Sequence, residues 1–321
     1  MNQQQTLLGI FLILYLALGF ATTPVKSTKA IQKTPGHYNL EAMGSYNNFR
    51  FSSDNSGGYN KYNGQSYITM LGGHKTKIKE NWLAGLFFYN AYVQLNSDVL
   101  ISPGAPANTY ETIINNNLMA HILHQITPHW YVDVLGSYGQ SKMTYLTSIG
   151  SSTEENNSSG NATGYGNNWF TSLTGGYVGA KNNFLVRAYV SALFSQINQQ
   201  TFSLNFPSTA IVNNIPSLTN NATFLLEHLE ITYGKSQYIQ PFMSAGLLEV
   251  LQFSNSRLIV DGLTLPGALP EFNLNQNGFR AGGGINFNYK KLIVRLEQQY
   301  NQRGSVYRSN QSIVTLIWSI S

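Results

Sequence analysis

Short and long connections alternate between the candidate strands that fill the chain after residue 36, and this rhythm strongly limits the possible folds. We count about twelve such strands. In a closed barrel of the bacterial outer-membrane type, tight turns lie on the periplasmic side and longer loops lie outside. Because hydrocarbon cannot solvate backbone amides, only helices and closed barrels span a membrane. The pattern therefore predicts an all-β fold, a transmembrane antiparallel β-barrel of about 12 strands over residues 37–321.

The order of the connections is consistent with this topology. The predicted short turns lie at 79–81, 126–128, 181–183, 234–236 and 289–291. Six longer loops would then share the extracellular end, chief among them the polar loops 149–166, 200–219 and 254–276. An even number of strands returns the C-terminus to the periplasmic side, where the last strand can pair with the first. We regard these three loops as candidate sites for an extracellular ligand.

Alternation of apolar and polar residues predicts which side chains face lipid. In a membrane barrel one set of alternate residues faces lipid and the other faces the lumen. A lipid-facing Arg or Lys at mid-depth costs roughly 2–4 kcal/mol, so charged residues on the strands are expected to point inward. This argument assigns four residues to the lumen, which we name the interior charged set: Arg187, Arg280, Arg295 and Glu297.

The interior charged set has two interpretations. The four side chains could form a buried ion-pair network that fills and stiffens the lumen. They could instead line a pore with a preference for anions, as rings of cationic side chains do in channels. A twelve-stranded bore is intermediate between the packed interior of eight-stranded barrels and the open channel of porins.

One predicted strand does not follow the alternation. Glu227 is opposite in parity to His228 and Glu230, so either orientation directs a polar group outward. Glu249 on the next strand presents a similar ambiguity. A β-bulge, or a position close to the membrane interface, would resolve the conflict.

The composition agrees with a membrane barrel. Charged residues make up 10% of the chain, against about a quarter in typical soluble domains. The 20 Tyr and 17 Phe suit aromatic girdles at the two membrane interfaces. The net charge is +5 but no dense Lys/Arg run is present, so we expect no nucleic-acid partner. The absence of Cys excludes disulfides and thiolate metal sites.

The N-terminal residues have features of an export signal. Residues 7–20 are continuously apolar but too short for a comfortable membrane span. We predict a Sec signal peptide over 1–21, cleaved after Ala21, although an uncleaved anchor helix is the alternative. Residues 22–36 carry two prolines and no apolar face, and we interpret them as a periplasmic tether. No later segment approaches the length of a membrane helix, so we expect the protein in the outer membrane.

Three segments carry a resemblance to a known family. They are LGGHKTKIKENWLAGLFFYNAYVQL at 71–95, TSLTGGYVGAKNNFLVRAYVSALFSQ at 171–196 and FRAGGGINFNYKKLIVRLEQQYN at 279–301. They resemble hairpins of the translocator β-domain of bacterial autotransporters, and the likeness covers about 38–321. The resemblance implies a monomeric barrel in outer-membrane lipid that the barrel-assembly machinery inserts.

The chain departs from the family pattern in two places. Only about fifteen residues separate the predicted cleavage site from the first strand, so we expect neither a passenger domain nor a full pore helix. The usual C-terminal aromatic residue is also absent. Trp318 and Ile320 share one face of the last strand and would have to replace it in recognition by the assembly machinery.

The sequence holds few residues in patterns typical of catalysis. His121 and His124 would lie on opposite faces of a strand, so they cannot close on one metal ion. A lipid hydrolase could combine a serine of 147–159 with His121, His124 or His129, but no Gly-x-Ser-x-Gly motif occurs. We interpret Glu154 and Glu155 as two solvated carboxylates on a loop and not as a catalytic acid/base pair. The glycines at 282–284 lack a following helix for phosphate binding and more simply leave room for a large neighbour. We therefore expect no enzyme activity, catalytic residue, cofactor or metal.

Three functions remain after this search. The favoured one is a passenger-less, porin-like channel or a structural barrel. The alternative is a cell-surface adhesion or interaction protein that acts through its long extracellular loops. A third is the translocation of a separately encoded partner, which the family resemblance suggests.

Overall fold

A computed structural model describes residues 38–55, 58–79, 81–100, 106–149, 158–207, 211–255 and 276–320. The predicted signal peptide and tether lie outside these residues and stay predictions. No helix among the described residues is long and apolar enough to cross a membrane.

The described residues form one antiparallel sheet of fourteen strands. Their bounds are β1 Tyr38–Asn55, β2 Gly58–Lys79, β3 Trp82–Leu100, β4 Pro106–Gln125, β5 Trp130–Ile149, β6 Ser158–Lys181, β7 Phe184–Gln199, β8 Phe202–Phe206, β9 Ile211–Ile215, β10 Leu218–Tyr233, β11 Ile239–Asn255, β12 Gly278–Tyr289, β13 Leu292–Arg303 and β14 Tyr307–Ile320.

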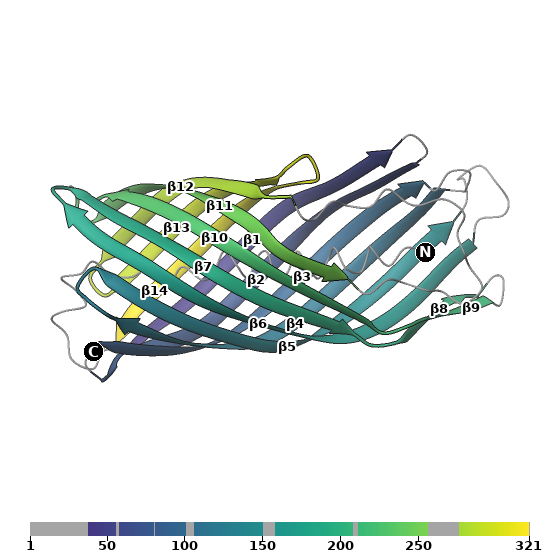
Figure 1. Ribbon diagram of the computed structural model, residues 1–321, viewed down its shortest axis with the longest axis horizontal. Coiled ribbons are helices and arrows are strands. Elements are labelled where there is room, and N and C mark those ends of the chain that lie inside the picture. The colour runs from purple at the N-terminus through teal and green to yellow at the C-terminus, as the bar shows by residue number, and fades with distance from the viewer. Residues whose placement is uncertain are drawn as a thin grey trace.

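Two pairings close this sheet into a barrel. The first strand pairs with the last, from Tyr38 opposite Ile320 to Phe51 opposite Tyr307. On the other side β5 pairs with β6 along its whole length. Twelve strands form the closed wall, and the short strands β8 and β9 extend it at one end (Figure 1). The predicted fold class and strand number are confirmed.

The periplasmic end is built from tight turns, as predicted. Asn81, Asn182 and Lys290 have positive φ angles in the turns that follow β2, β6 and β12. Asn tolerates this left-handed conformation better than most residues, which explains two of the three positions. The outward-facing aromatic residues near this end form a girdle, which we call the inner girdle: Trp82, Trp130, Phe184, Tyr233 and Trp318.

A second row of aromatic residues lies further along the strands. Tyr46, Tyr67 and Tyr92 stand side by side on the outer surface of β1, β2 and β3, with ring centroids 5.2 Å and 6.4 Å apart. We call this row the outer girdle. Between the girdles the outer surface carries exposed apolar side chains such as Leu71 and Leu118. Two aromatic rows around an apolar band are the features expected of a wall that contacts lipid.

The prediction of a loop over residues 200–219 is wrong, because most of this segment forms a β-hairpin. The β6–β7 pairing ends with Gly166 opposite Gln199, and β8 pairs with β6 again at Asn161 opposite Asn205, one residue out of register. This shift is a β-bulge at residues 200 and 201. The bulge moves the buried face from odd to even residues, so Phe202 and Phe206 are buried on the inner side. β9 then pairs back along β8 and leads into β10.

Two other predicted loops are shorter than expected. Residues 158–166 of the predicted loop 149–166 belong to β6, and β11 continues to Asn255, within the predicted loop 254–276. Only 150–157 and 256–275 remain outside the described residues. The strands continue because backbone pairing does not depend on side-chain polarity. The stretch 158–166 is rich in Gly, Ser and Asn, so its sequence lacks the apolar alternation that marks a membrane strand, although alternate residues such as Ala162 are buried.

The expectation of six long extracellular loops is also wrong. Residues 56–57 alone separate β1 from β2, and a turn at 304–306 with Gly304 in a positive-φ conformation joins β13 to β14. The strands β2 to β6 have 19 to 24 residues, whereas β12, β13 and β14 have 12, 12 and 14. One side of the barrel therefore rises further from the membrane than the other (Figure 1).

Candidate functional site in the barrel interior

An ion-pair network crosses the barrel interior and is centred on Glu230 of β10. Its carboxylate accepts from Arg187 Nη1 at 3.2 Å and from Arg295 Nη2 at 2.7 Å. Arg295 also contacts Glu297 at 2.8 Å. Because β11 and β12 separate β10 from β13 in the sheet, the Arg295–Glu230 pair can only form through the interior.

Aromatic packing fixes the position of Arg295. Its guanidinium lies 3.7 Å from the centroid of the Phe242 ring on β11. A Cβ atom at Gly284 would meet that ring and the carbonyl oxygen of Leu296, so the glycine leaves room for Phe242. The three inward contacts of Arg295, to Glu230, Glu297 and Phe242, hold one guanidinium between β10, β11 and β13.

Arg280 occupies a different place from the rest of the interior charged set. Its guanidinium donates a hydrogen bond to the hydroxyl of Tyr189 on β7, again across the interior. The Tyr189 ring packs against His228, with centroids 4.8 Å apart. Arg280 is 6% exposed, and no carboxylate of the described residues forms an ion pair with it. It is the cation of the set whose charge no described carboxylate neutralises.

The structure brings three members of the interior charged set together and leaves the fourth separate. Arg187, Arg295 and Glu297 meet through Glu230, a residue that sequence reasoning did not assign to the site. Glu230 lies directly opposite Arg187 in the β7–β10 ladder. This opposition could not be predicted because residues 200–219 were interpreted as a loop, which leaves the register between the two flanking strands undefined.

The parity conflict around Glu227 is resolved without a bulge at that position. His228 and Glu230 are buried on the inner face, while Glu227 is half-buried and faces outward. The register shift in this strand lies at Thr223 and Phe224 instead. Glu227 borders a depression of about 740 Å³ in the outer wall. Its lining includes small residues of four strands: Gly175, Ala188, Ala245 and Ala281.

The opposite side of the interior holds a second polar cluster. His121 of β4 contacts Asp133 of β5 at 3.1 Å, and its ring lies 6.3 Å from that of His74. Asn39 bonds to His74 at 3.1 Å. Glu41 is buried on the same inner face. Sequence reasoning missed this cluster because its members come from four different strands and share no local spacing.

The three histidines considered for hydrolysis lie apart. His121 points into the interior, whereas His124 stacks on Trp82 on the outer surface with centroids 4.4 Å apart. His129 lies at a periplasmic turn, where its Nδ1 is 2.9 Å from the carbonyl oxygen of Val178. Among the described residues, no serine is hydrogen-bonded to any of the three.

Part of the remaining interior is apolar. Inward-facing side chains of β2, β3 and β4 include Ile68, Phe87, Val93 and Ile113, each at most 1% exposed. The interior therefore combines the charged network on β7, β10 and β13 with an apolar patch on β2 and β3 and with buried polar side chains on β1 and β4, among them Asn47, Glu111 and Asn117.

The sequence profile of the autotransporter beta-domain matches residues 40–297. The chain belongs to the autotransporter β-domain family. Membership places the barrel in the outer membrane, as predicted. No curated protein sequence matches the chain.

Solved structures of this family share the fold. The translocator domain of the autotransporter NalP from Neisseria meningitidis superimposes with a TM-score of 0.63 at 16% identity, covering 91% of both chains. The transport unit of the autotransporter AIDA-I from Escherichia coli gives a TM-score of 0.55 at 11% identity, covering 97% of this chain and 98% of that one. The β-domain of the Bordetella autotransporter BrkA gives 0.54 at 11% identity, covering 87% and 98%. At these identities the likeness establishes the fold alone.

Proposed function

We propose that this outer-membrane β-domain is a channel whose ion preference is set by Arg280. The proposal rests on one observation: Arg280 is buried in the interior and bonded to a neutral hydroxyl, while its neighbours are paired with carboxylates. Similarity to translocator and transport units of autotransporters supports a conducting role. Its expected monomeric state and its insertion by the barrel-assembly machinery stay predictions.

The arrangement divides the interior charged set into two roles. Arg187 and Arg295 share the carboxylates of Glu230 and Glu297, so two cations are balanced by two anions and contribute little net field. These four side chains bridge strands and hold the shape of the bore. Arg280 adds a positive charge that forms no ion pair with a described carboxylate.

Planar-bilayer recordings on the purified full chain test this role. Replacement of Arg280 by Gln should lower the anion-to-cation permeability ratio by about thirtyfold, because one charge at 4 Å in water attracts an anion and repels a cation by about 1 kcal/mol each. Lys142→Gln is the matched control: it removes the same charge from an exposed, outward-facing position on β5. Bilayers that stay silent, or equal effects of the two variants, would refute the proposal.

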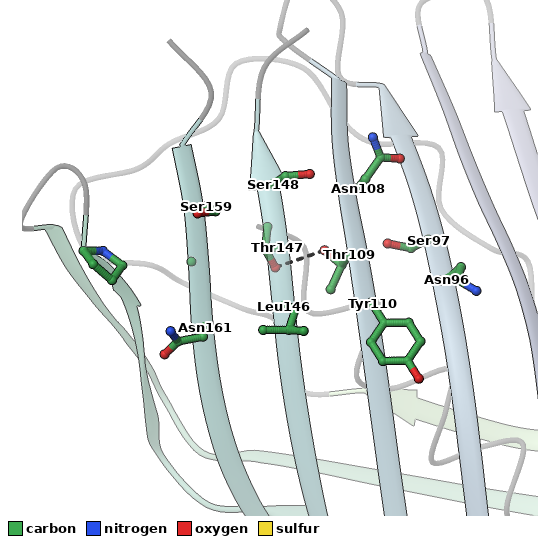
Figure 2. A pocket seen from close by; sticks show the side chains of 12 residues that line it. Asn96, Ser97, Asn108, Thr109, Tyr110, Leu146, Thr147, Ser148, Ser159 and Asn161 are labelled. Atoms are coloured by element: carbon green, nitrogen blue, oxygen red, sulfur yellow. Dashed lines mark hydrogen bonds between the residues drawn. The ribbon is translucent and has the colours of Figure 1, made fainter. Parts of the chain in front are cut away.

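A surface-interaction function is the alternative, and the extended side of the barrel favours it. The ends of β3 to β6 and the turn after β8 line a polar pocket of about 420 Å³ (Figure 2). Thr109 and Thr147 are joined there by a hydrogen bond of 3.1 Å, and Asn108 and Asn161 lie nearby (Figure 2). Side-chain hydroxyls and amides of this kind suit a polar ligand such as a carbohydrate.

Removal of the hairpin 202–215 separates the two functions. The β7–β10 ladder ends with Gln199 opposite Leu218, so the shortened connection still joins paired strands. If the surface protein acts through this end, the deletion should abolish attachment to host or neighbouring cells while the barrel keeps its folded gel mobility. Unchanged attachment would exclude the hairpin as a binding element.

A further inference from the structure

Two arginines face each other on the outer surface at the seam that closes the barrel. Arg50 of β1 lies directly opposite Arg308 of β14 in the ladder, and both side chains are exposed. Among the described residues, neither guanidinium forms an ion pair or a hydrogen bond. Lys61 of β2 is exposed on the same face, one diagonal position from Arg50.

The backbone beneath these arginines is rigidly held. On the inner face Phe51 packs on Tyr307 with ring centroids 4.6 Å apart, and Phe49 packs on Phe51 at 6.0 Å. The amide of Ser52 donates to the carbonyl of Val306 at 3.0 Å. Directly opposed residues of a ladder have Cβ atoms about 5 Å apart, and like charges in such a pair destabilise the sheet. The seam therefore holds two positive charges close together with no described group to compensate them.

The height of the pair on the wall indicates what compensates it. Arg50 lies four residues beyond Tyr46 of the outer girdle, about 13 Å further along the strand. With a strand tilt of about 40°, this places the guanidinium about 10 Å outside the girdle. Aromatic girdles mark the membrane interface, so the arginines lie at the depth of the outer-leaflet headgroups.

We propose that Arg50 and Arg308 together bind a phosphate group of an outer-leaflet glycolipid, with its acyl chains against the apolar band below Tyr46 and Tyr67. Guanidinium groups match the geometry of phosphate oxygens and form charge-assisted pairs with them. A phosphate between the two arginines converts their repulsion into two attractions. The lipid headgroup is the favoured source because the pair lies on the outer face of the wall and not in the interior.

Thermal unfolding of the full chain in detergent, with and without added lipid, tests this site. Diphosphorylated lipid A should raise the unfolding midpoint, whereas dephosphorylated lipid A and inorganic phosphate should not. Arg50→Gln and Arg308→Gln should each weaken the apparent affinity for diphosphorylated lipid A by about tenfold, the loss expected for one charge-assisted bond. Lys142→Gln is the control, because Lys142 lies as far along β5 from Trp130 as Arg50 lies along β1 from Tyr38.

The same variants without lipid distinguish binding from a structural role. If the arginines repel each other, Arg308→Gln should unfold at the same temperature as the wild type or above it. A lower midpoint without lipid would assign them a structural role and overturn the proposal. An equal response of the double variant Arg50→Gln/Arg308→Gln and the wild type to diphosphorylated lipid A would also overturn it. An equal shift with inorganic phosphate alone would exclude the lipid as the ligand.

Discussion

Replacement of Glu230 by Gln should test whether the interior network stabilises the barrel. The change removes the carboxylate that lies 3.2 Å from Arg187 and 2.7 Å from Arg295, but keeps the size of the side chain. Removing one partner of a buried ion pair typically costs about 3–5 kcal/mol, because the remaining charge is left in a poorly solvating site. Exposed pairs cost about 0–1 kcal/mol.

The low exposure of these side chains places the Glu230 network nearer to the buried ion pairs than to the exposed ones. The side chains of Glu230, Arg295 and Arg187 are 5%, 10% and 18% exposed. Arg295 keeps Glu297 at 2.8 Å after the substitution, so the loss falls mainly on Arg187. We therefore expect the lower end of the range for buried pairs, about 3 kcal/mol of unfolding free energy. The double variant Arg187→Gln/Glu230→Gln should recover about 1 kcal/mol or more of this loss.

Guanidinium unfolding of the barrel in lipid vesicles, followed by tryptophan fluorescence and by gel mobility, measures these differences. Glu227→Gln is the internal control, because it makes the same chemical change three residues away on the outer face. If Glu230→Gln costs less than about 1 kcal/mol, the network behaves as an exposed pair and the reasoning fails. It also fails if Glu227→Gln destabilises the barrel equally.

Three further substitutions follow from the packing. Glu227→Gln should stabilise the barrel by up to about 2 kcal/mol, because the outward carboxylate contacts lipid. The same guanidinium titration measures this change in unfolding free energy. A loss of stability would instead indicate that Glu227 has a partner. Gly284→Ala should cost about 1–3 kcal/mol, because its methyl group meets the Leu296 carbonyl and the Phe242 ring, whereas Gly136→Ala enters open space and should be neutral. Phe202→Ala removes a stacked contact with Tyr145, whose ring centroid is 5.1 Å away, so limited proteolysis should cleave the β8–β9 hairpin faster while the barrel wall stays intact.

The part of the fold within the membrane follows from the alternation of residue types. Val190 and Phe194 are exposed and Tyr189 and Ser191 are buried, as period-two geometry requires when one face contacts lipid. The segments 158–166 and 202–215 were predicted as loops because the first is rich in Gly, Ser and Asn and the second is divided into two strands of only five residues each. Strand pairing continues there because it needs only backbone amides and carbonyls.

The candidate site could be predicted only in part for a related reason. Parity shows that a residue such as Arg295 or Arg280 is better placed inside, but it does not show which interior groups meet across the bore. Those meetings depend on the stagger of strands that are not neighbours in the sheet. Arg295 reaches Glu230 across two intervening strands, and His121 meets Asp133 beside a histidine of β2.

The division of the interior charges predicts that stability and ion preference can be changed separately, and with opposite signs of selectivity. Glu230→Gln removes a negative charge from the interior, so channels that survive the loss of stability should prefer anions more strongly than the wild type. Arg280→Gln removes a positive charge and should prefer them less. Because Arg280 bonds to the neutral hydroxyl of Tyr189, its loss strands no buried carboxylate among the described residues and should cost less stability than Glu230→Gln. Bilayer recordings on both variants measure the anion-to-cation permeability ratio. If this ratio changes in the same direction in both variants, neither charge acts on the permeating ion.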